Sequence, residues 1–135
     1  MQVNSEMNGK VALVTGGTRG IGAAIAIALA RHGCQVLVTA RSNEGFDSFA
    51  STVDNDIIDQ INFMACDFED TQQVSFLEKH LHKTNIDILI NNAGINKIAA
   101  AADIDPDDFA RIQRVNVEVP FLLSRAVIQQ MSKNK

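Results

Sequence analysis

The chain has 135 residues, of which 46% are hydrophobic and 21% charged, a composition typical of one soluble globular domain. Its net charge of −4 argues against a nucleic-acid-binding surface, and no apolar run approaches the roughly 18 residues that a membrane-spanning helix needs. The polar start, Met1–Gly9, lacks the apolar core of a signal peptide. Together with two cysteines and no sign of export, this start predicts a cytoplasmic protein with reduced thiols.

Four short runs of apolar and β-branched residues predict strands along the chain. The runs are Lys10–Thr15, Gln35–Ala40, Ile61–Ala65 and Ile86–Asn91. Each run is too short for a helix of ordinary length, and most are followed closely by glycine or polar residues. We therefore expect four strands that are largely buried.

Helical patterns separate and follow these strands. Apolar residues recur at helical spacing over Ile21–Leu29, and Gly33 is well suited to end that helix. A weaker helical pattern covers Asn43–Val53, and another includes Val74–Leu81. Proline is favoured in the first turn of a helix, so a long final helix is predicted over Pro106–Met131.

The alternation of strand and helix predicts the architecture. Parallel strands joined by right-handed crossovers form an α/β, doubly wound sheet, with helices on both faces. No repeat or linker interrupts residues 1–135, so a single domain is expected. Cys34 and Cys66 flank neighbouring strands at opposite ends, about 15–20 Å apart, so no disulfide is predicted between them.

The strongest local motif lies between the first strand and the first helix, where Thr15–Gly22 reads TGGTRGIG. Gly16, Gly20 and Gly22 would allow a tight turn, close approach of the backbone to a pyrophosphate, and close packing of helix and strand. The helix N-terminus would offer free N–H groups to the phosphates. Three glycines can also form a turn and nothing more, but a strand before them and a helix after them favour dinucleotide binding.

The spacing Gly-x-x-x-Gly-x-Gly resembles the fingerprint of the short-chain dehydrogenase/reductase family, and three further matches follow in the same order. CDF at 66–68 is similar to the segment whose acid binds the adenine ring, and NNAG at 91–94 matches a motif after the fourth strand. RVNV at 114–117 resembles the family's Asn-bearing helix. The resemblance runs from about Lys10 to Met131 and implies a Rossmann-type fold that binds NAD or NADP.

The resemblance also implies which residues contact the cofactor. They belong to the glycine turn, the end of the second strand and the segments that follow the third and fourth strands. The expected cofactor-binding residues are Gly16, Thr18, Arg19, Gly20, Ile21, Gly22, Arg41, Ser42, Asp67, Asn92, Ala93 and Gly94.

The end of the second strand indicates which cofactor is preferred. An NAD site places Asp or Glu there to bind the ribose 2′-hydroxyl, but this chain has Ala40 followed by Arg41. A guanidinium would hold a 2′-phosphate by charge-assisted hydrogen bonds, with Arg19 and Ser42 as further contacts. Either arginine alone is as readily a solvated surface residue, and Glu44 nearby is a contrary signal. Because two arginines converge, NADP(H) is predicted in preference to NAD(H).

Asn116 lies inside the last predicted helix, where Asn is a poor helix former. In the family, the matching Asn supports a proton relay through a backbone carbonyl that a local helix distortion exposes. Pro120, four residues later, has no N–H to donate to that carbonyl, which fits such a distortion. Asn116 is therefore the one candidate for a catalytic role, in support only. The three histidines are predicted to be structural, and no metal site is expected.

The family transfers hydride between nicotinamide and the carbonyl or alcohol carbon of a small molecule. The resemblance implies a Tyr as general acid, a Lys four residues later and a Ser that holds the substrate oxygen. This chain contains no Tyr. We therefore expect an N-terminal half, truncated after the fourth strand and its helix and inactive alone. A non-catalytic dinucleotide-binding or interaction module that works without a second half remains the alternative.

A chain of this kind would leave apolar surface without cover. The strand at Ile86–Asn91 would become a sheet edge, and the long helix would leave several apolar side chains partly bare. We therefore expect a homo-oligomer, or association with a complementary second half, in place of a stable monomer. The residues expected to be partly bare are Phe121, Leu122, Val127, Ile128 and Met131.

Overall fold

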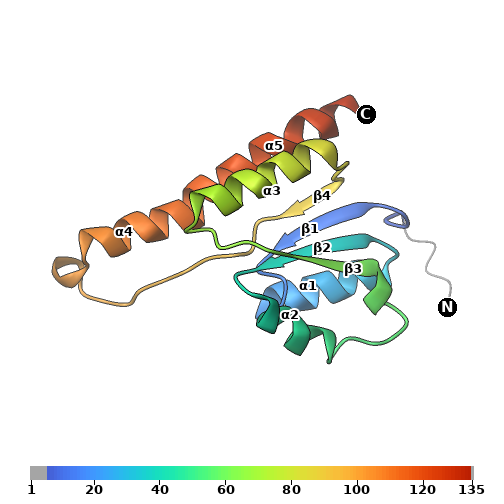
Figure 1. The fold of residues 1–135 in the computed structure, drawn as a ribbon, viewed down its shortest axis with the longest axis horizontal. Helices are drawn as coiled ribbons and strands as arrows, with labels where there is room; N and C mark the ends of the chain where they lie inside the picture. Colours follow the sequence, from blue (N-terminus) through green and yellow to red (C-terminus); the bar gives the residue numbers. More distant parts are fainter. Residues whose placement is uncertain (1–5, 135) are drawn as a thin grey trace.

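The centre of the molecule is a four-stranded parallel sheet, seen in a computed structural model that describes residues 6–134 (Figure 1). The strands are β1 (Val11–Thr15), β2 (Gln35–Ala40), β3 (Ile61–Ala65) and β4 (Ile88–Ile90). Their spatial order is β3-β2-β1-β4, and every pair is parallel. The predicted α/β, doubly wound sheet is confirmed. Residues 1–5 of the polar start lie outside the described residues.

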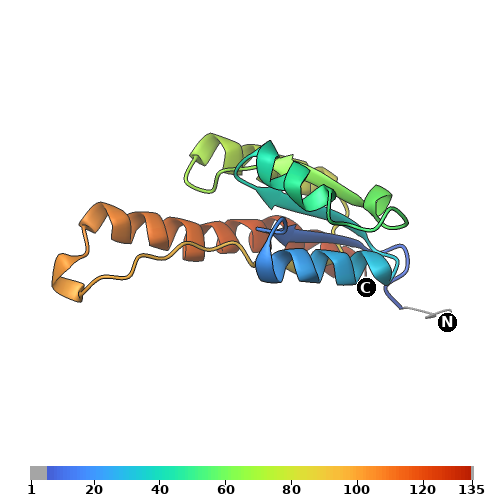
Figure 2. The ribbon, with the colours of Figure 1, turned by 90° about the horizontal axis from the view of Figure 1, so that it is seen from below.

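Helices cover both faces of the sheet (Figures 1 and 2). One face carries α1 (Gly20–Arg31) and α2 (Asn43–Ala50), and the other carries α3 (Thr71–Lys83) and α5 (Val119–Lys133). Successive residues of β1 enter different cores, because side chains alternate across a strand. Leu13 packs toward α3 and α5, and Val14 packs toward α1 and α2. This arrangement explains why the strands have almost continuous apolar runs.

Two elements end earlier than predicted, and polar hydrogen bonds explain both ends. β4 ends at Ile90 because the chain turns there, with the Asn92 N–H donating to the Ile90 carbonyl at 3.1 Å. α2 ends at Ala50 because Ser51 and Thr52 donate their hydroxyls to carbonyls three residues earlier, each at 2.7 Å. Such local bonds compete with continuation of a helix.

The long final helix is interrupted, as the pair of Asn116 and Pro120 predicted. It consists of α4 (Pro106–Gln113), a π-helical turn (Arg114–Glu118) and α5, which run end to end (Figure 1). The Val119 N–H donates to the Arg114 carbonyl five residues earlier, which is the π-helical spacing. Two short 3₁₀ helices, Ile58–Gln60 and Ala101–Asp103, complete the described elements.

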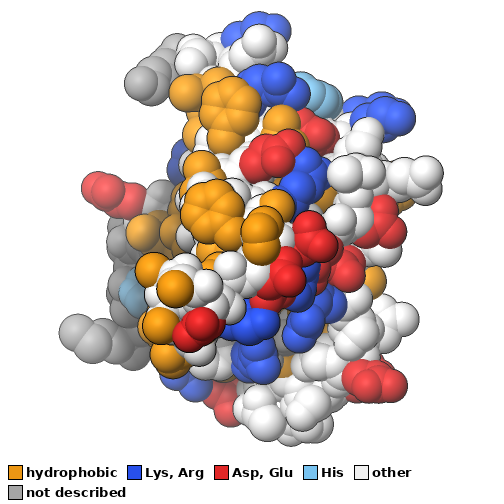
Figure 3. Space-filling model, turned by 90° about the vertical axis from the view of Figure 1, so that its left-hand side faces the viewer, with side chains coloured by type: hydrophobic (Ala, Val, Ile, Leu, Met, Phe, Trp, Pro, Cys, Tyr) orange, Lys and Arg blue, Asp and Glu red, His pale blue; other side chains and the backbone are white. Residues whose placement is uncertain are grey.

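The outward face of the long helix is partly apolar, although less than predicted. The expectation that Val127 is bare was wrong: it is buried, because α5 packs closely along α3. Leu122 and Met131 are partly buried against the same core. Figure 3 shows hydrophobic side chains gathered in a band beside a mixed group of acidic and basic side chains, at the end of the molecule that carries α4. The exposed large hydrophobic residues of this helix are Phe109, Val117, Phe121 and Ile128.

Both cysteines are free and buried in the interior, as the strand layout predicted. Burial, together with the neighbouring charges of Asp67 and Asp70, raises the pKa of the Cys66 thiol to about 11. Cys66 is therefore protonated at neutral pH and is a packing residue, not a nucleophile. In residues 6–134, no helix is long and apolar enough to cross a membrane.

Candidate functional site

A cavity of about 540 Å³ opens at the carboxyl ends of the strands, where doubly wound sheets bind their ligands. All the predicted cofactor-binding residues line it except Gly22, which is buried behind the turn. The structure thus brings together four sequence segments that are up to 78 residues apart. The predicted residues at the cavity are Gly16, Thr18, Arg19, Gly20, Ile21, Arg41, Ser42, Asp67, Asn92, Ala93 and Gly94.

The glycine turn has the geometry that a phosphate site requires. Gly16 and Gly20 have φ values of +62° and +55°, a region that favours glycine. A Cβ at Gly20 would meet no atom within 4 Å, so the backbone is open at this point of the cavity wall. Arg19, the N-cap of α1, makes no capping hydrogen bond, and the first turn of α1 contains no acid. The first N–H groups of α1 therefore suit an anion such as a pyrophosphate.

Hydrogen bonds between the ends of β1 and β4 hold this turn in place. The Thr15 hydroxyl accepts from the N–H groups of Asn92 and Ala93, both at 3.0 Å. The Asn92 amide donates to the carbonyls of Thr15 and Gly16, both at 3.1 Å. Asn92 therefore has a structural role, in addition to lining the cavity. Thr15 was not among the predicted site residues. The feature of the sequence that could have pointed to it is a hydroxyl side chain at the last position of a buried strand.

Two arginines face the cavity without an acidic partner. Arg19 and Arg41 are exposed, and neither forms an ion pair with any residue that the structure describes. Arg41 follows directly after β2, and Ser42 is the N-cap of α2 with a side chain that makes no capping hydrogen bond. Arg41 and Ser42 thus leave a guanidinium and a hydroxyl for a ligand, with Ala40 in place of an acid.

The segment after β3 is held in a defined conformation beside these arginines. The Glu69 N–H donates to the Asp67 carboxylate at 3.0 Å, and the Asp67 N–H donates to the Gln73 side chain at 2.8 Å. Asp70 caps α3 by accepting from the N–H groups of residues 72 and 73, at 2.9 and 3.2 Å. These hydrogen bonds lower the pKa of Asp70, and the one from the backbone N–H of Gln73 has the largest effect. Asp67 is thereby fixed at the cavity wall.

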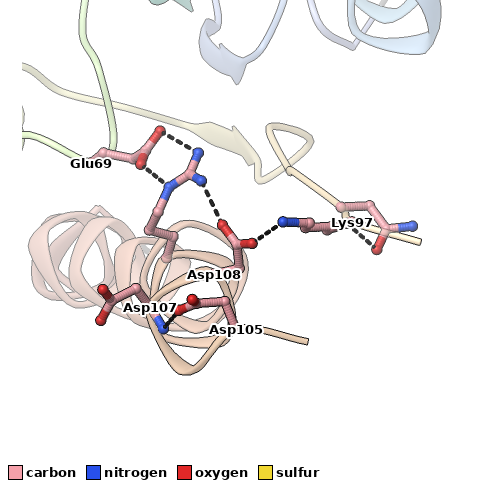
Figure 4. Close-up of polar contacts among 7 residues, drawn as sticks. Glu69, Lys97, Asp105, Asp107 and Asp108 are labelled. Atoms are coloured by element: carbon pink, nitrogen blue, oxygen red, sulfur yellow. Dashed lines mark hydrogen bonds and ion pairs between the residues drawn. The ribbon is translucent and has the colours of Figure 1, made fainter. Parts of the chain in front are cut away.

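A chain of alternating charges joins this segment to α4 (Figure 4). Arg111 donates to both carboxylate oxygens of Glu69, at 2.5 and 3.4 Å, and to Asp108 at 2.9 Å. Asp108 in turn pairs with Lys97. The hydrogen bond from Arg111 lowers the pKa of Glu69, and the charge of Arg41 lowers it further. Sequence reasoning missed this network because its central pair is 42 residues apart.

Asn116 lies in the π-helical turn, and its side chain binds the segment after β4. Its amide accepts from the Ile95 N–H and donates to the Ile95 carbonyl, both at 2.8 Å. Asn91 reaches α5 separately, donating to the Ser124 hydroxyl at 3.2 Å. The side chain of Asn116 therefore has a structural role, and a relay function would use its backbone carbonyl. Within residues 6–134, no group of three His, Cys, Asp or Glu side chains is suited to a metal ion.

Comparison with known proteins identifies the family. The family model described as short chain dehydrogenase matches residues 10–135. The chain belongs to this family. Versicolorin reductase stcU of Emericella nidulans is 37% identical over 131 residues, which cover 95% of this chain and 49% of that protein. The 3-oxoacyl-(acyl-carrier-protein) reductase FabG of Rickettsia bellii is 32% identical, over 96% of this chain and 52% of that protein. The chain thus spans about half the length of the curated relatives it matches.

Solved structures agree with this short-chain dehydrogenase fold. The bulky-bulky ketone specific alcohol dehydrogenase from Comamonas testosteroni superposes with a TM-score of 0.86 at 30% identity, over 94% of this chain and 51% of that one. A metagenomic short-chain oxidoreductase in complex with NADP superposes with a TM-score of 0.84 at 30% identity, over 96% of this chain and 60% of that one. A Rossmann-like fold and membership of the short-chain dehydrogenase family are therefore established.

Proposed function

We propose that this chain is the NADP(H)-binding half of an oxidoreductase that moves hydride between nicotinamide and the carbonyl or alcohol carbon of a small molecule. Family membership supports the reaction class, and a related structure that contains NADP supports the cofactor. The observation that carries the preference for NADP(H) is Arg41, which lies unpaired at the cavity directly after β2. A carboxylate at the end of this strand would instead favour NAD(H).

The cavity offers groups that suit the two phosphate-bearing parts of NADP(H) and its adenine ring. The open backbone at Gly20 and the free N–H groups of α1 suit the pyrophosphate. Arg41, Ser42 and Arg19 suit a 2′-phosphate, and Asp67 suits the adenine amino group. The bound cofactor would supply or accept the hydride. This chain's residues would bind and orient it.

Proton transfer to the substrate would depend on residues outside this chain. Asn116 belongs to the supporting structure, and the sequence contains no Tyr to act as the family's general acid. The chain alone is therefore proposed to bind cofactor without reducing a carbonyl. A homo-oligomer or a complementary second half would cover the β4 edge and the exposed apolar residues of α5, in a cytoplasmic setting.

Calorimetric titration with NADPH and NADH tests the cofactor preference. The unmodified chain should bind NADPH more tightly, because each charge-assisted hydrogen bond contributes about 1.5–3 kcal/mol. Arg41→Asp should reverse the preference, since it removes an attraction and adds a repulsion. Arg125→Asp makes the same charge change on α5, at a residue that does not line the cavity, and should leave the ratio of affinities unchanged. Equal affinity of the unmodified chain for both cofactors would contradict the proposal.

A further inference from the structure

The carboxylate of Glu69 lies where it could compete for Arg41. Both residues line the same cavity, and the segments that carry them start side by side, since the Cys66 N–H donates to the Ala40 carbonyl at 2.9 Å. The pKa of Glu69 is lowered mainly by the hydrogen bond and charge of Arg111, and to the smallest extent by the charge of Arg41, which therefore lies within electrostatic reach of this carboxylate. A free carboxylate here would attract the guanidinium and repel a phosphate.

Glu69 is not free, because Arg111 occupies both of its oxygens. The guanidinium of Arg111 binds them as a fork, at 2.5 and 3.4 Å, which fixes the direction of the carboxylate (Figure 4). Asp108 holds the other side of Arg111 at 2.9 Å, and Lys97 neutralises Asp108. Of the four residues in this network, Glu69 lines the cavity and Arg111, Asp108 and Lys97 do not, so Glu69 is the member that can contact a ligand there.

We propose that Arg111 is a specificity-determining residue for the cofactor: by keeping Glu69 paired, it leaves Arg41 available to the 2′-phosphate of NADP(H). The proposal rests on the function proposed above. Arg111 acts through another residue and is therefore a positioning residue. NAD(H) has no 2′-phosphate, so the pairing of Glu69 affects its affinity little. The network thus links α4 to the choice between two cofactors.

The test measures the affinities of NADP⁺ and NAD⁺ by calorimetry for a set of variants. Arg111→Gln should weaken NADP⁺ binding about tenfold, the low end of what one charge-assisted contact contributes, and change NAD⁺ binding less than about twofold. The double variant Glu69→Gln/Arg111→Gln should return NADP⁺ affinity to within about twofold of the unmodified chain, because the competing carboxylate is gone. Arg111→Lys, which keeps the charge, should retain most of the preference.

Arg125→Gln is the matched control. It also removes an exposed arginine from an ion pair, with Glu78 at 3.4 Å, and its side chain is 62% exposed against 53% for Arg111. Its ratio of affinities should equal that of the unmodified chain.

Three outcomes would overturn the proposal. They are an equal loss of affinity for both cofactors in Arg111→Gln, no change of either affinity in Arg111→Gln, and a double variant that binds NADP⁺ as weakly as the single one. The first would give Arg111 a purely structural role. If the unmodified chain shows no preference for NADP⁺, the function proposed above fails as well, and that result is visible before any variant is made.

Discussion

Replacement of Gly22 by alanine tests the packing of the glycine turn. A Cβ at this position would lie 2.2 Å from the Gly16 carbonyl oxygen and 2.5 Å from the Asn92 amide nitrogen, so α1 or the turn must move by about 1 Å. Overpacking against backbone costs up to about 3 kcal/mol, and loss of an Asn92 hydrogen bond costs about 1 kcal/mol more. The better helix propensity of alanine offsets about 1 kcal/mol. We expect a net loss of about 3 kcal/mol.

Gly20→Ala is the matched control, because Gly20 belongs to the same turn. Its φ of +55° makes alanine unfavourable by about 1–2 kcal/mol, but a Cβ there meets no atom within 4 Å. With a urea slope of about 2 kcal/mol per molar, the midpoint should fall by about 1.5 M for Gly22→Ala and about 0.7 M for Gly20→Ala. Protein concentration must be constant, since association would raise the apparent stability. A Gly22→Ala midpoint no lower than that of Gly20→Ala would refute the reasoning.

Three further predictions concern activity, association and pH. Material of verified mass should not oxidise NADPH with any carbonyl substrate, and turnover without a second chain would contradict this. Sedimentation at micromolar concentration should detect association, which Phe121→Glu or Ile128→Glu should weaken because both side chains are exposed; a monodisperse monomer would count against it. The fold lowers the pKa of Glu69 below its ordinary value of 4.5, so the ion pair of Glu69 stabilises the folded chain at pH values above 4.5. This stabilisation is lost as the pH falls and the carboxylate becomes protonated. The stability gap between the unmodified chain and Glu69→Gln should therefore narrow in acid, and a constant gap would argue against the pairing.

Features that depend on neighbouring residues were predictable from the sequence. The parallel sheet followed from the alternation of short apolar runs with helical patterns, because parallel strands need crossover connections. A local distortion of the last helix was expected from the family resemblance, and Pro120 fitted it because its missing N–H removes one hydrogen bond at a known place; the π-helical form of the distortion was not predicted. The unpaired state of Arg41 was expected only in part, because it depends on where Glu44 and Glu69 lie.

Features that depend on distant residues were not predictable. Val127 was expected to be bare, but its burial depends on how closely α5 lies against α3, which the helical pattern does not specify. The pair of Glu69 and Arg111 requires the end of β3 to meet α4. Charged residues in exposed segments have many possible partners, and the sequence does not distinguish among them.

The glycine turn depends both on neighbouring residues and on distant ones. Its glycines can be recognised in the sequence, but the contacts that hold the turn in place cannot. The glycines make the turn possible, but Thr15 and Asn92, 77 residues apart, hold it against the end of β4. The same Asn92 amide leaves no room for a side chain at Gly22. Thr15 and Asn92 therefore keep the open backbone at Gly20 in position, whether or not they contact a ligand themselves. The proposed phosphate site would thus be ordered before a ligand arrives, and little conformational entropy would be lost on binding.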